Sequence, residues 1–444
     1  MSGVARLLSA SGKKVSGSDA KESETTRQLQ TEGIDVKIGH NGSNIPADSD
    51  LVVYSPAVDE DNIERQAAKS RGIKQLSHFE FIGELSSEYE TIAIAGTNGK
   101  STTTALVGLL LEAGGLDPTV IVGAEVVSWK SNIRLGKSDL LVVEADEFDR
   151  KFLLLHPKTI VVTNIETDHL DTYGNLNAVR EAFSQFAKLA PSSPEGKIFY
   201  NSDDDVSKSV FGAHKFAAHP HPYGIESGYL HLGGNEVKAR SQIITASYLK
   251  KKLKYSLPLP GKHNIYNSLA AASVALSKGV SMDVLTRVFA DYKGLHRRFE
   301  ILGKSGRAAV ISDYGHHPTA IRLTMAGARE FYPNQKIMLI FQPHQPHRTK
   351  ALFDEFVESL VDAMPDELVL VEIFNPKGRS SEDEKVSSLD LVEKISKRFS
   401  NVRYLPNLEK AFEYVQGKTS EYDVILCMGA GDIHEMAEKL VSSK

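Results

Sequence analysis

The chain has 444 residues, a length that predicts about three domains of roughly 150 residues each. Apolar residues make up 41% and charged residues 25%, values that are typical of globular proteins and exclude a disordered or collagen-like chain. A formal net charge of -5 disfavours a nucleic-acid-binding surface, because such surfaces cluster Lys and Arg. Cys427 is the single cysteine, so no intramolecular disulfide forms and we expect a cytoplasmic protein. No run approaches the ~20 apolar residues that span a bilayer, so we expect no membrane insertion.

The first residues form a helical pattern of apolar positions, Val4, Leu7 and Leu8, followed by a predicted strand that ends in the acid Asp19. This is a βαβ unit without its first strand, which in nucleotide-binding units delivers a glycine-rich turn to the helix N-terminus. The pattern therefore predicts that the first βα unit of this chain is incomplete.

Short β-branched runs alternate with longer amphipathic stretches along the chain, a pattern that predicts an α/β fold with parallel sheets. Most of the runs are continuously apolar, as expected for strands covered on both faces. The predicted buried strands are residues 50–54, 91–95, 140–143, 159–163, 336–341, 367–372 and 423–427. Between residues 223 and 260 the pattern shifts toward alternation, which predicts a small antiparallel patch.

Polar segments near residues 84–90 and 292–297 divide the chain into three blocks. We expect an N-terminal domain over residues 1–87, a central domain over 88–294 and a C-terminal domain over 295–444.

A glycine-rich turn at residues 95–104 lies directly after a predicted strand and before a helical segment, which is the context a phosphate-binding loop requires. Lys100 can supply charge to the β and γ phosphates, and Ser101 can offer a hydroxyl to Mg2+. The common pattern G-x-x-x-x-G-K-[ST] is not complete, because Ile94 occupies the first glycine position. The alternative is an ordinary turn with a surface lysine. The predicted ATP-binding residues of this loop are Gly96, Thr97, Asn98, Gly99, Lys100, Ser101 and Thr102.

Acidic segments follow two predicted strands, at residues 144–149 and 164–171. Ligands of open α/β sheets bind beyond the carboxyl ends of strands, so these acids are expected to converge on the glycine-rich loop. Glu144 together with the Ser101 hydroxyl and phosphate oxygens is a sufficient ligand set for Mg2+. His169 is a less typical ligand, and a hydrogen-bonded structural role is its alternative.

Paired polar residues stand farther along the chain. Asn264 and Asn267 are three residues apart, on one helix face, where their amides could reach a nucleotide; helix capping is the alternative for Asn264. Arg298, next to Arg297 at the second joint, could reach phosphate across a domain cleft, with a surface salt bridge as its alternative.

The C-terminal block carries three motifs at predicted strand ends, residues 311–319, 341–349 and 428–433. Their histidines match no usual zinc spacing and no cysteine ligands accompany them, so we expect no zinc site.

Taken in order, these segments closely resemble the signatures of the Mur ligase family over essentially the whole chain. Within the family they are most similar to the members that join L-alanine to UDP-N-acetylmuramate. The segments are the glycine-rich loop, residues 144–147, 164–166 with Asp168 and His169, His263 and Asn264 with Asn267, 297–299, 313–318 and 429–432.

The resemblance implies a Rossmann-like N-terminal domain that binds the UDP-sugar, a central P-loop ATPase domain and a Rossmann-like C-terminal domain that brings the amino acid. It implies ATP and Mg2+ as cofactors and an acyl phosphate formed on UDP-N-acetylmuramate, to which L-alanine is added for peptidoglycan synthesis. We expect a monomer or weak homodimer.

The resemblance also implies roles for single residues. The implied catalytic residues are Lys100, Glu144, His169 and Asp313, of which Glu144 and His169 bind metal with Ser101. Residues implied to surround the nucleotide are Asn264, Asn267, Arg298 and Asp313. Implied substrate-binding residues are Asp19, His40, Ser55, His316, His317, His344 and Arg348.

The chain departs from the family pattern at four places. Asn98 stands at a usual His, Ser312 at a frequent Asp and Gln345 at a usual Arg. Residues 1–5 align with the end of the family's G-x-G-G-x-G-M-S segment, so the first strand and its glycines are absent. The resemblance thus implies that the chain starts inside its first βα unit, through a misassigned initiation codon or trimming at a methionine. Gln345 removes a cationic contact, so the preferred amino acid stays open. The alternatives are a ligase that recycles a tripeptide, a folylpolyglutamate synthetase and an inactive nucleotide-binding homologue; the segment 341–344 favours the alanine-adding members over the first.

Overall fold

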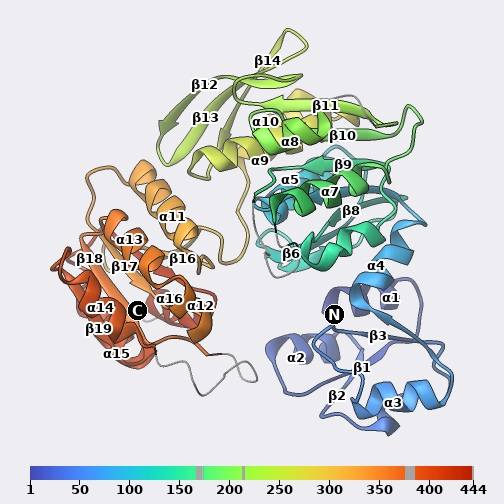
Figure 1. The fold of residues 1–444 in the computed structure, drawn as a ribbon, viewed down its shortest axis with the longest axis horizontal. Helices are drawn as coiled ribbons and strands as arrows, with labels where there is room; N and C mark the ends of the chain where they lie inside the picture. Colours follow the sequence, from blue (N-terminus) through green and yellow to red (C-terminus); the bar gives the residue numbers. More distant parts are fainter. Residues whose placement is uncertain (167–172, 174, 213–215, 376–385, 443–444) are drawn as a thin grey trace.

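The computed structural model describes residues 1–166, 173, 175–212, 216–375 and 386–442. Its sheets fall into three successive blocks of the chain, shown in Figure 1 in blue, green and orange to red. The N-terminal block has two sheets of two strands, the central block one of ten strands and the C-terminal block one of six strands. The mixed α/β architecture predicted from the sequence is confirmed. Within the described part of the chain, no helix combines the length and the apolar character needed to cross a membrane.

The N-terminal block consists of two separate parallel strand pairs, β1 with β2 and β3 with β4. Leu29, Ile34 and Val36 form a small core of their own beside β2. Helix α1 instead packs Val4 and Leu7 into the large core shared with the central block. The elements are α1 (Ser2–Ala10), β1 (Ser16–Asp19), α2 (Glu24–Thr31), β2 (Asp35–Ile38), η1 (Gly42–Asn44), β3 (Leu51–Tyr54), α3 (Ile63–Ser70), β4 (Lys74–Ser77) and α4 (His78–Ser86).

The central sheet has the strand order β14-β13-β12-β11-β10-β9-β5-β8-β6-β7. Its first elements are β5 (Glu90–Ala95), α5 (Lys100–Ala113), β6 (Thr119–Val126), β7 (Ser131–Arg134), β8 (Leu140–Glu144), η2 (Phe148–Leu154), β9 (Thr159–Val162) and α7 (Leu176–Ala187). It continues with β10 (Lys197–Asn201), α8 (Asp205–Phe211), β11 (His219–Gly224), β12 (Leu230–Lys238), β13 (Ser241–Tyr248), β14 (Lys251–Leu257), α9 (Lys262–Ser277) and α10 (Met282–Ala290).

Strand β5 lies at the middle of this sheet, parallel to β8 on one side and β9 on the other. Because side chains alternate along a strand, Ile92 and Ile94 enter the core beneath α5 and α9, whereas Ala93 and Ala95 enter the core beneath α7. The carboxyl ends of three adjacent parallel strands therefore meet where α5 begins. Strands β12, β13 and β14 pair antiparallel at the far edge of the sheet, where the sequence predicted an antiparallel patch.

The C-terminal sheet has the order β15-β16-β20-β17-β18-β19, and only β15 runs antiparallel to its neighbour. Buried helix residues cover both faces, with α11, α13 and α14 on one and α15 and α16 on the other. The elements are β15 (Glu300–Ser305), β16 (Ala308–Asp313), α11 (Pro318–Phe331), β17 (Ile337–Phe341), α12 (Pro346–Ala351), α13 (Phe353–Asp362), β18 (Glu367–Val371), α14 (Ser388–Ile395), β19 (Val402–Leu405), α15 (Leu408–Gln416), β20 (Val424–Met428) and α16 (Ile433–Ser442).

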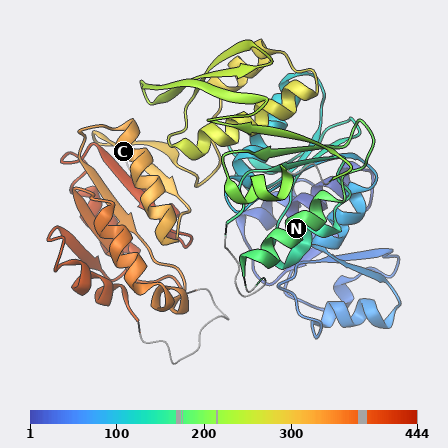
Figure 2. The ribbon, with the colours of Figure 1, turned by 45° about the horizontal axis from the view of Figure 1, so that its top comes forward.

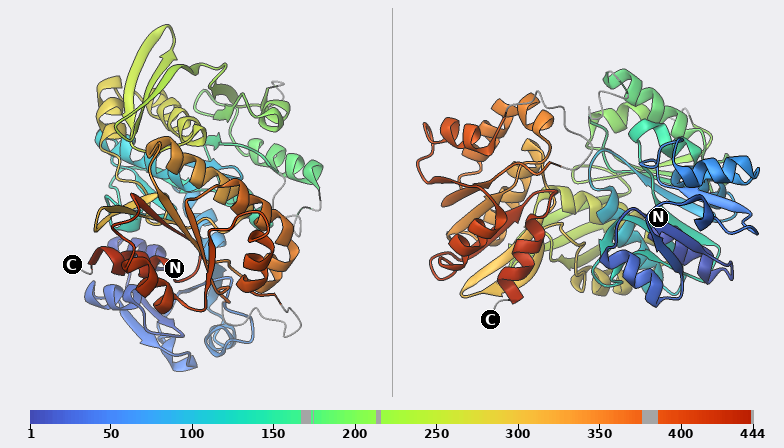
Figure 3. Two further views of the ribbon diagram at one scale, coloured as in Figure 1. Left: turned by 90° about the vertical axis from the view of Figure 1, so that its left-hand side faces the viewer. Right: turned by 90° about the horizontal axis from the view of Figure 1, so that it is seen from below.

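The central and C-terminal blocks stand side by side in Figures 2 and 3 and are joined by the segment between α10 and β15. This segment is hydrogen-bonded to the end of β6, through His296 N to Glu125 O at 2.9 Å and Val127 N to Gly294 O at 3.3 Å. A second contact joins the blocks where Gly261 N donates to the Glu330 carboxylate at 2.8 Å.

Candidate active site

The glycine-rich loop connects β5, which ends at Ala95, to α5, which begins at Lys100. Gly96 and Gly99 have φ values of 134° and 85°, which side chains rarely adopt. A Cβ atom on Gly96 would lie 2.1 Å from Thr163 Oγ1, and one on Gly99 would lie 2.2 Å from Asn267 Oδ1. Both positions therefore require glycine, as a loop that approaches other backbone and side-chain groups this closely must.

The loop is tied to the segment that follows β9. Thr97 N donates to Asn164 O and Asn98 N donates to Asn164 Oδ1, both at 3.0 Å. Thr163 Oγ1 donates to Asn98 O at 2.6 Å. These contacts fix the loop before the first turn of α5, which contains Lys100, Ser101 and Thr102. Asn98, the departure from the family pattern, thus makes its contacts through backbone atoms.

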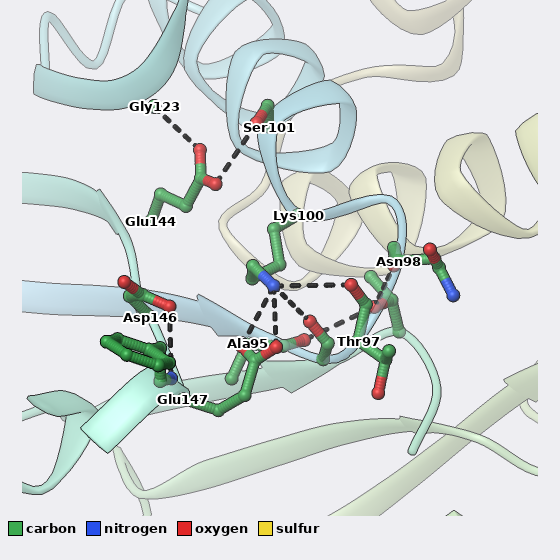
Figure 4. Close-up of polar contacts among 12 residues, drawn as sticks. Ala95, Thr97, Asn98, Lys100, Ser101, Gly123, Glu144, Asp146 and Glu147 are labelled. Carbon is green, nitrogen blue, oxygen red and sulfur yellow. Dashed lines mark hydrogen bonds and ion pairs between the residues drawn. The ribbon is translucent and has the colours of Figure 1, made fainter. Parts of the chain in front are cut away.

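Lys100 folds back over the loop (Figure 4). Its Nζ donates to Gly96 O at 2.7 Å, Thr97 O at 3.3 Å and Glu147 Oε1 at 2.9 Å. The second carboxylate oxygen of Glu147 lies 2.8 Å from Nζ. Burial raises the pKa of the Glu147 carboxyl, while the nearby Lys100 ammonium acts in the opposite direction. The sequence did not single out Glu147, although it belongs to the acidic segment that follows β8.

Glu144 ends β8 and faces the first turn of α5 (Figure 4). Ser101 Oγ donates to Glu144 Oε1 at 3.0 Å, and Gly123 N donates to Glu144 Oε2 at 2.6 Å. A hydroxyl and a carboxylate at hydrogen-bond distance are the hard oxygen donors that suit Mg2+, which keeps several waters. Ser101 and Glu144 therefore suit a Mg2+ ion. The third predicted ligand, His169, lies outside the described residues.

The amides of Asn264 and Asn267 lie together on one face of α9, next to the glycine-rich loop. Asn267 Nδ2 donates to Asn264 Oδ1 at 3.1 Å, and Thr103 Oγ1 donates to Asn267 Oδ1 at 3.4 Å. The residue that precedes α9 is Gly261, so Asn264 does not cap the helix. The structure thus brings these two residues to the loop from a distant part of the sequence.

The guanidiniums of both arginines of the second joint lie near the Tyr314 ring, that of Arg297 at 4.9 Å from its centre, but Arg297 also forms hydrogen bonds. Arg297 donates to Gly429 O at 2.7 Å and Gly431 O at 2.9 Å, which fixes it to the turn after β20. The guanidinium of Arg298 lies 5.1 Å from the centre of the Tyr314 ring.

Asp313, at the end of β16, accepts from Phe299 N at 2.9 Å and Gly315 N at 2.8 Å. Burial raises the pKa of its carboxyl. These hydrogen-bond donors belong to the C-terminal block, so Asp313 here organises the end of its own strand.

Two of the predicted C-terminal histidines, His316 and His344, lie close together, whereas His317 caps a helix. His316 has its ring centre 5.7 Å from that of His344, which stacks on Phe374 at 5.5 Å. Burial lowers the pKa of His316 to about 4, so its ring is neutral at neutral pH. His317 caps α11, accepting from Thr319 N at 3.4 Å. Arg348 lies in the short helix α12, which follows His344.

The predicted substrate residues of the N-terminal block lie at the ends of β1, β2 and β3. Asp19 accepts from Lys21 N at 3.1 Å and Ser55 Oγ accepts from Ala57 N at 3.3 Å. The Nδ1 atom of His40 lies 3.7 Å from Glu64, whose carboxylate also accepts from Ser18, Asn41 and Asn44. The sequence did not single out Glu64, because its partners come from two distant segments, one at Ser18 and one at residues 40–44.

Family models match three successive parts of the chain. The part at residues 1–90 matches "Mur ligase family, catalytic domain", residues 94–275 match "Mur ligase middle domain" and residues 297–431 match "Mur ligase, glutamate ligase domain". A curated relative from Caldanaerobacter subterraneus subsp. tengcongensis, named UDP-N-acetylmuramate--L-alanine ligase, is 36% identical over 99% of this chain and 95% of its own length. The chain belongs to the Mur ligase family. The resemblance drawn from the motifs is thereby confirmed.

Other Mur ligases extend the comparison. A relative of the same name from Aquifex aeolicus is 38% identical over 99% of this chain and 94% of its own length. The crystal structure of UDP-N-acetylmuramate-alanine ligase MurC from Thermotoga maritima has a TM-score of 0.84 and 28% identity, covering 100% of this chain and 97% of its own. A murein peptide ligase from Psychrobacter arcticus shares the fold, with a TM-score of 0.71, 22% identity and coverage of 100% and 96%. The three-domain Mur ligase fold expected from the sequence is confirmed.

Proposed function

We propose that this Mur ligase uses ATP to join L-alanine to the carboxylate of UDP-N-acetylmuramate, in the synthesis of peptidoglycan precursors. The observation that carries the proposal is the loop between β5 and α5, where Lys100 and the Ser101–Glu144 pair meet at glycines that tolerate no side chain. Relatives that bear this activity in their names match the chain over nearly its whole length.

The reaction proceeds in two displacements. An oxygen of the sugar-linked carboxylate attacks the γ phosphorus of ATP, and ADP leaves. The amine of L-alanine then attacks the carbonyl carbon of the acyl phosphate, and the tetrahedral intermediate expels phosphate as the amine nitrogen loses a proton. Lys100 stabilises the charge that develops on the transferring phosphoryl oxygens. Ser101 and Glu144, with His169 as the third predicted ligand, would hold Mg2+, which when bound would neutralise further phosphate charge.

The remaining residues are assigned by block. Asn264, Asn267 and Thr102 surround the nucleotide, and Arg298 and Asp313 approach it when the C-terminal block closes on the loop. The amino acid binds near His316, His317, His344 and Arg348, and the UDP-sugar binds near Asp19, His40 and Ser55. We place the domain limits at 87/88 and 294/295, and the protein in the cytoplasm as a monomer or weak homodimer.

Substrate-dependent phosphate release tests this function. Wild-type protein with ATP, Mg2+ and UDP-N-acetylmuramate should release phosphate when L-alanine is added, and mass spectrometry should find the alanyl product. Lys100→Ala should lower the turnover rate by about 100-fold or more, because one charge-stabilising contact is removed at the transferring group.

The same assay separates the second candidate. A recycling ligase would respond to the tripeptide and ignore L-alanine, and that result would replace the proposed substrate. Unchanged turnover in a folded Lys100→Ala protein would overturn the assignment of the phosphate-binding loop itself.

A further inference from the structure

Glu147 is the acidic side chain that contacts Lys100, yet it belongs to neither the metal-binding pair nor the glycine-rich loop. We propose that Glu147 is a positioning residue that anchors the Lys100 ammonium at the mouth of the loop while the phosphoryl group is transferred. The inference rests on the proposed role of this loop in binding ATP. It divides the two glutamates of one segment between two tasks, Glu144 beside Ser101 and Glu147 beside Lys100.

The burial of Glu147 explains why the contact must persist. Its side chain is 4% exposed, whereas that of Lys100 is 16% exposed. A carboxylate removed from water in this way is strongly destabilised if its cationic partner leaves. Lys100 therefore cannot turn fully toward a nucleotide and abandon Glu147.

The three contacts of Lys100 Nζ differ in length, and this difference indicates which acceptor a phosphate oxygen would replace. An ammonium has three hydrogens, and Lys100 directs them to Gly96 O, Thr97 O and Glu147. The contact with Thr97 O is the longest, at 3.3 Å, and Thr97 is half-buried rather than fully buried. A phosphate oxygen can replace that carbonyl, while Gly96 O and Glu147 keep Nζ in place.

The backbone around Glu147 is held firmly enough to serve as an anchor. Ala145 N donates to Ile94 O at 2.8 Å, and Phe152 N donates to Asp146 O at 2.9 Å. The hydroxyl of Tyr173 donates to Glu147 O. A fixed carboxylate thus restrains the long lysine side chain, which otherwise samples many rotamers.

Glu147→Gln tests the proposal, because glutamine keeps the shape of the side chain and removes its charge. Titration calorimetry with a non-hydrolysable ATP analogue and Mg2+ should give a Kd within about threefold of wild type, since the phosphate contacts remain. The kcat for phosphate release should fall by about 10- to 100-fold, because the ammonium is no longer fixed for the transition state. Glu147→Asp keeps the charge but moves it away from Nζ. This variant should also keep a Kd close to wild type, and its kcat should fall less than that of Glu147→Gln.

Glu90→Gln is the matched control. Glu90 begins β5, the strand whose other end leads into the glycine-rich loop, and it forms an ion pair with Lys278. The variant therefore removes a lysine-paired carboxylate that lies away from the loop. It should keep the wild-type kcat. Thermal unfolding of all variants checks that they are folded.

A double-mutant cycle decides whether Glu147 acts through Lys100. In a Lys100→Ala background, Glu147→Gln should change kcat by less than about twofold, because the group that it positions is gone. The proposal would be overturned if the losses of kcat in Lys100→Ala and Glu147→Gln multiplied in the double variant. It would also be overturned if Glu147→Gln alone kept the wild-type kcat. If wild-type turnover required the tripeptide rather than L-alanine, the proposed substrate would fall, and the same cycle would be measured with the tripeptide.

Discussion

Among the single residues of the site, Glu144 has a carboxylate that is fixed by hydrogen bonds from two neighbouring elements. Glu144 is fixed by Gly123 N at 2.6 Å and meets Ser101 from the neighbouring helix. A Cβ atom on Gly123 would lie 2.8 Å from the carboxylate, so the close approach of the backbone depends on glycine there. The carboxylate is therefore held in one orientation toward the Ser101 hydroxyl.

Removal of the Ser101 hydroxyl should weaken Mg2+ binding. Ser101→Ala should raise the Mg2+ concentration for half-maximal phosphate release by about 10-fold, the size of effect seen when a group that supports a metal site is lost. Ser101→Thr keeps the hydroxyl and serves as the control, with a Mg2+ dependence close to wild type. Identical Mg2+ curves for wild type and Ser101→Ala would remove Ser101 from the metal site.

The sequence predicted residues whose role follows from a local motif, and it missed residues whose contacts depend on distant segments, even where, like Glu147, they lie inside a motif. Lys100 and Ser101 were predictable because a strand, a glycine-rich turn and a helix follow one another directly. Glu147 was not, because its pairing with Lys100 depends on how the segment after β8 is buried. Glu64 was missed for a similar reason, since it joins Ser18 of β1 to Asn41 and Asn44 in the segment that follows β2.

At the scale of elements, the unit formed by β5, the loop and α5 is constrained by what packs on it. Gly99 is the residue before α5, with φ of 85°, and its Cα faces Asn267 of α9. The phosphate-binding loop and the asparagine face of α9 therefore form one packed unit.

Gly99→Ala should damage nucleotide binding beyond the effect of backbone strain. Gly115 provides the control, because it also has a positive φ, 81°, but nothing lies within 4 Å of a Cβ placed there. Both variants should lose about 1–2 kcal/mol of stability from the left-handed backbone. Only Gly99→Ala should in addition weaken binding of an ATP analogue, by about 10-fold or more, as the loop and Asn267 are forced apart. Equal affinities in the two variants would contradict this packing.

The segment that joins the central and C-terminal blocks contains an ion pair between a histidine and a glutamate. His296 Nδ1 lies 2.9 Å from the Glu300 carboxylate, and this hydrogen bond raises the pKa of His296 above its ordinary value of 6.5. The folded chain thus holds this proton more tightly than the unfolded chain. The resulting stabilisation is complete below pH 6.5 and is lost as the pH rises through the raised pKa.

Glu300→Gln should remove this pH-dependent contribution. The difference in Tm between wild type and variant should be larger at about pH 6 than at about pH 8.5, because only the protonated His296 pairs with the carboxylate. Glu438→Gln removes a more distant carboxylate near the same histidine and should give a smaller dependence. A difference that grows with rising pH would show the opposite linkage.

Element positions were largely predictable, but their neighbours in the sheet were not. Continuous apolar runs marked β5, β8 and β9 because both faces of these strands are buried. The order that places β5 between β8 and β9 depends on contacts between distant segments, which local patterns do not encode. The division of the N-terminal block into two strand pairs has the same non-local origin.

At the scale of the whole molecule, the groups assigned to the reaction are distributed over all three blocks. Lys100 and Glu144 belong to the central block, whereas Arg298, Asp313 and His344 belong to the C-terminal block. Hydrogen bonds at Gly294 and His296 fix the connection between the two blocks to the end of β6. Under the proposed function, the loop of the central block activates a carboxylate that the other blocks hold near both the loop and the amine.

The fate of the carboxylate oxygen shows whether the carboxylate is activated as an acyl phosphate. UDP-N-acetylmuramate labelled with the heavy stable isotope of oxygen in its carboxylate would be turned over with ATP and L-alanine, and the released phosphate analysed by mass spectrometry. Activation as an acyl phosphate predicts that every phosphate carries one labelled oxygen, because the attacking oxygen leaves with the phosphoryl group. Unlabelled phosphate released together with the alanyl product would contradict the account.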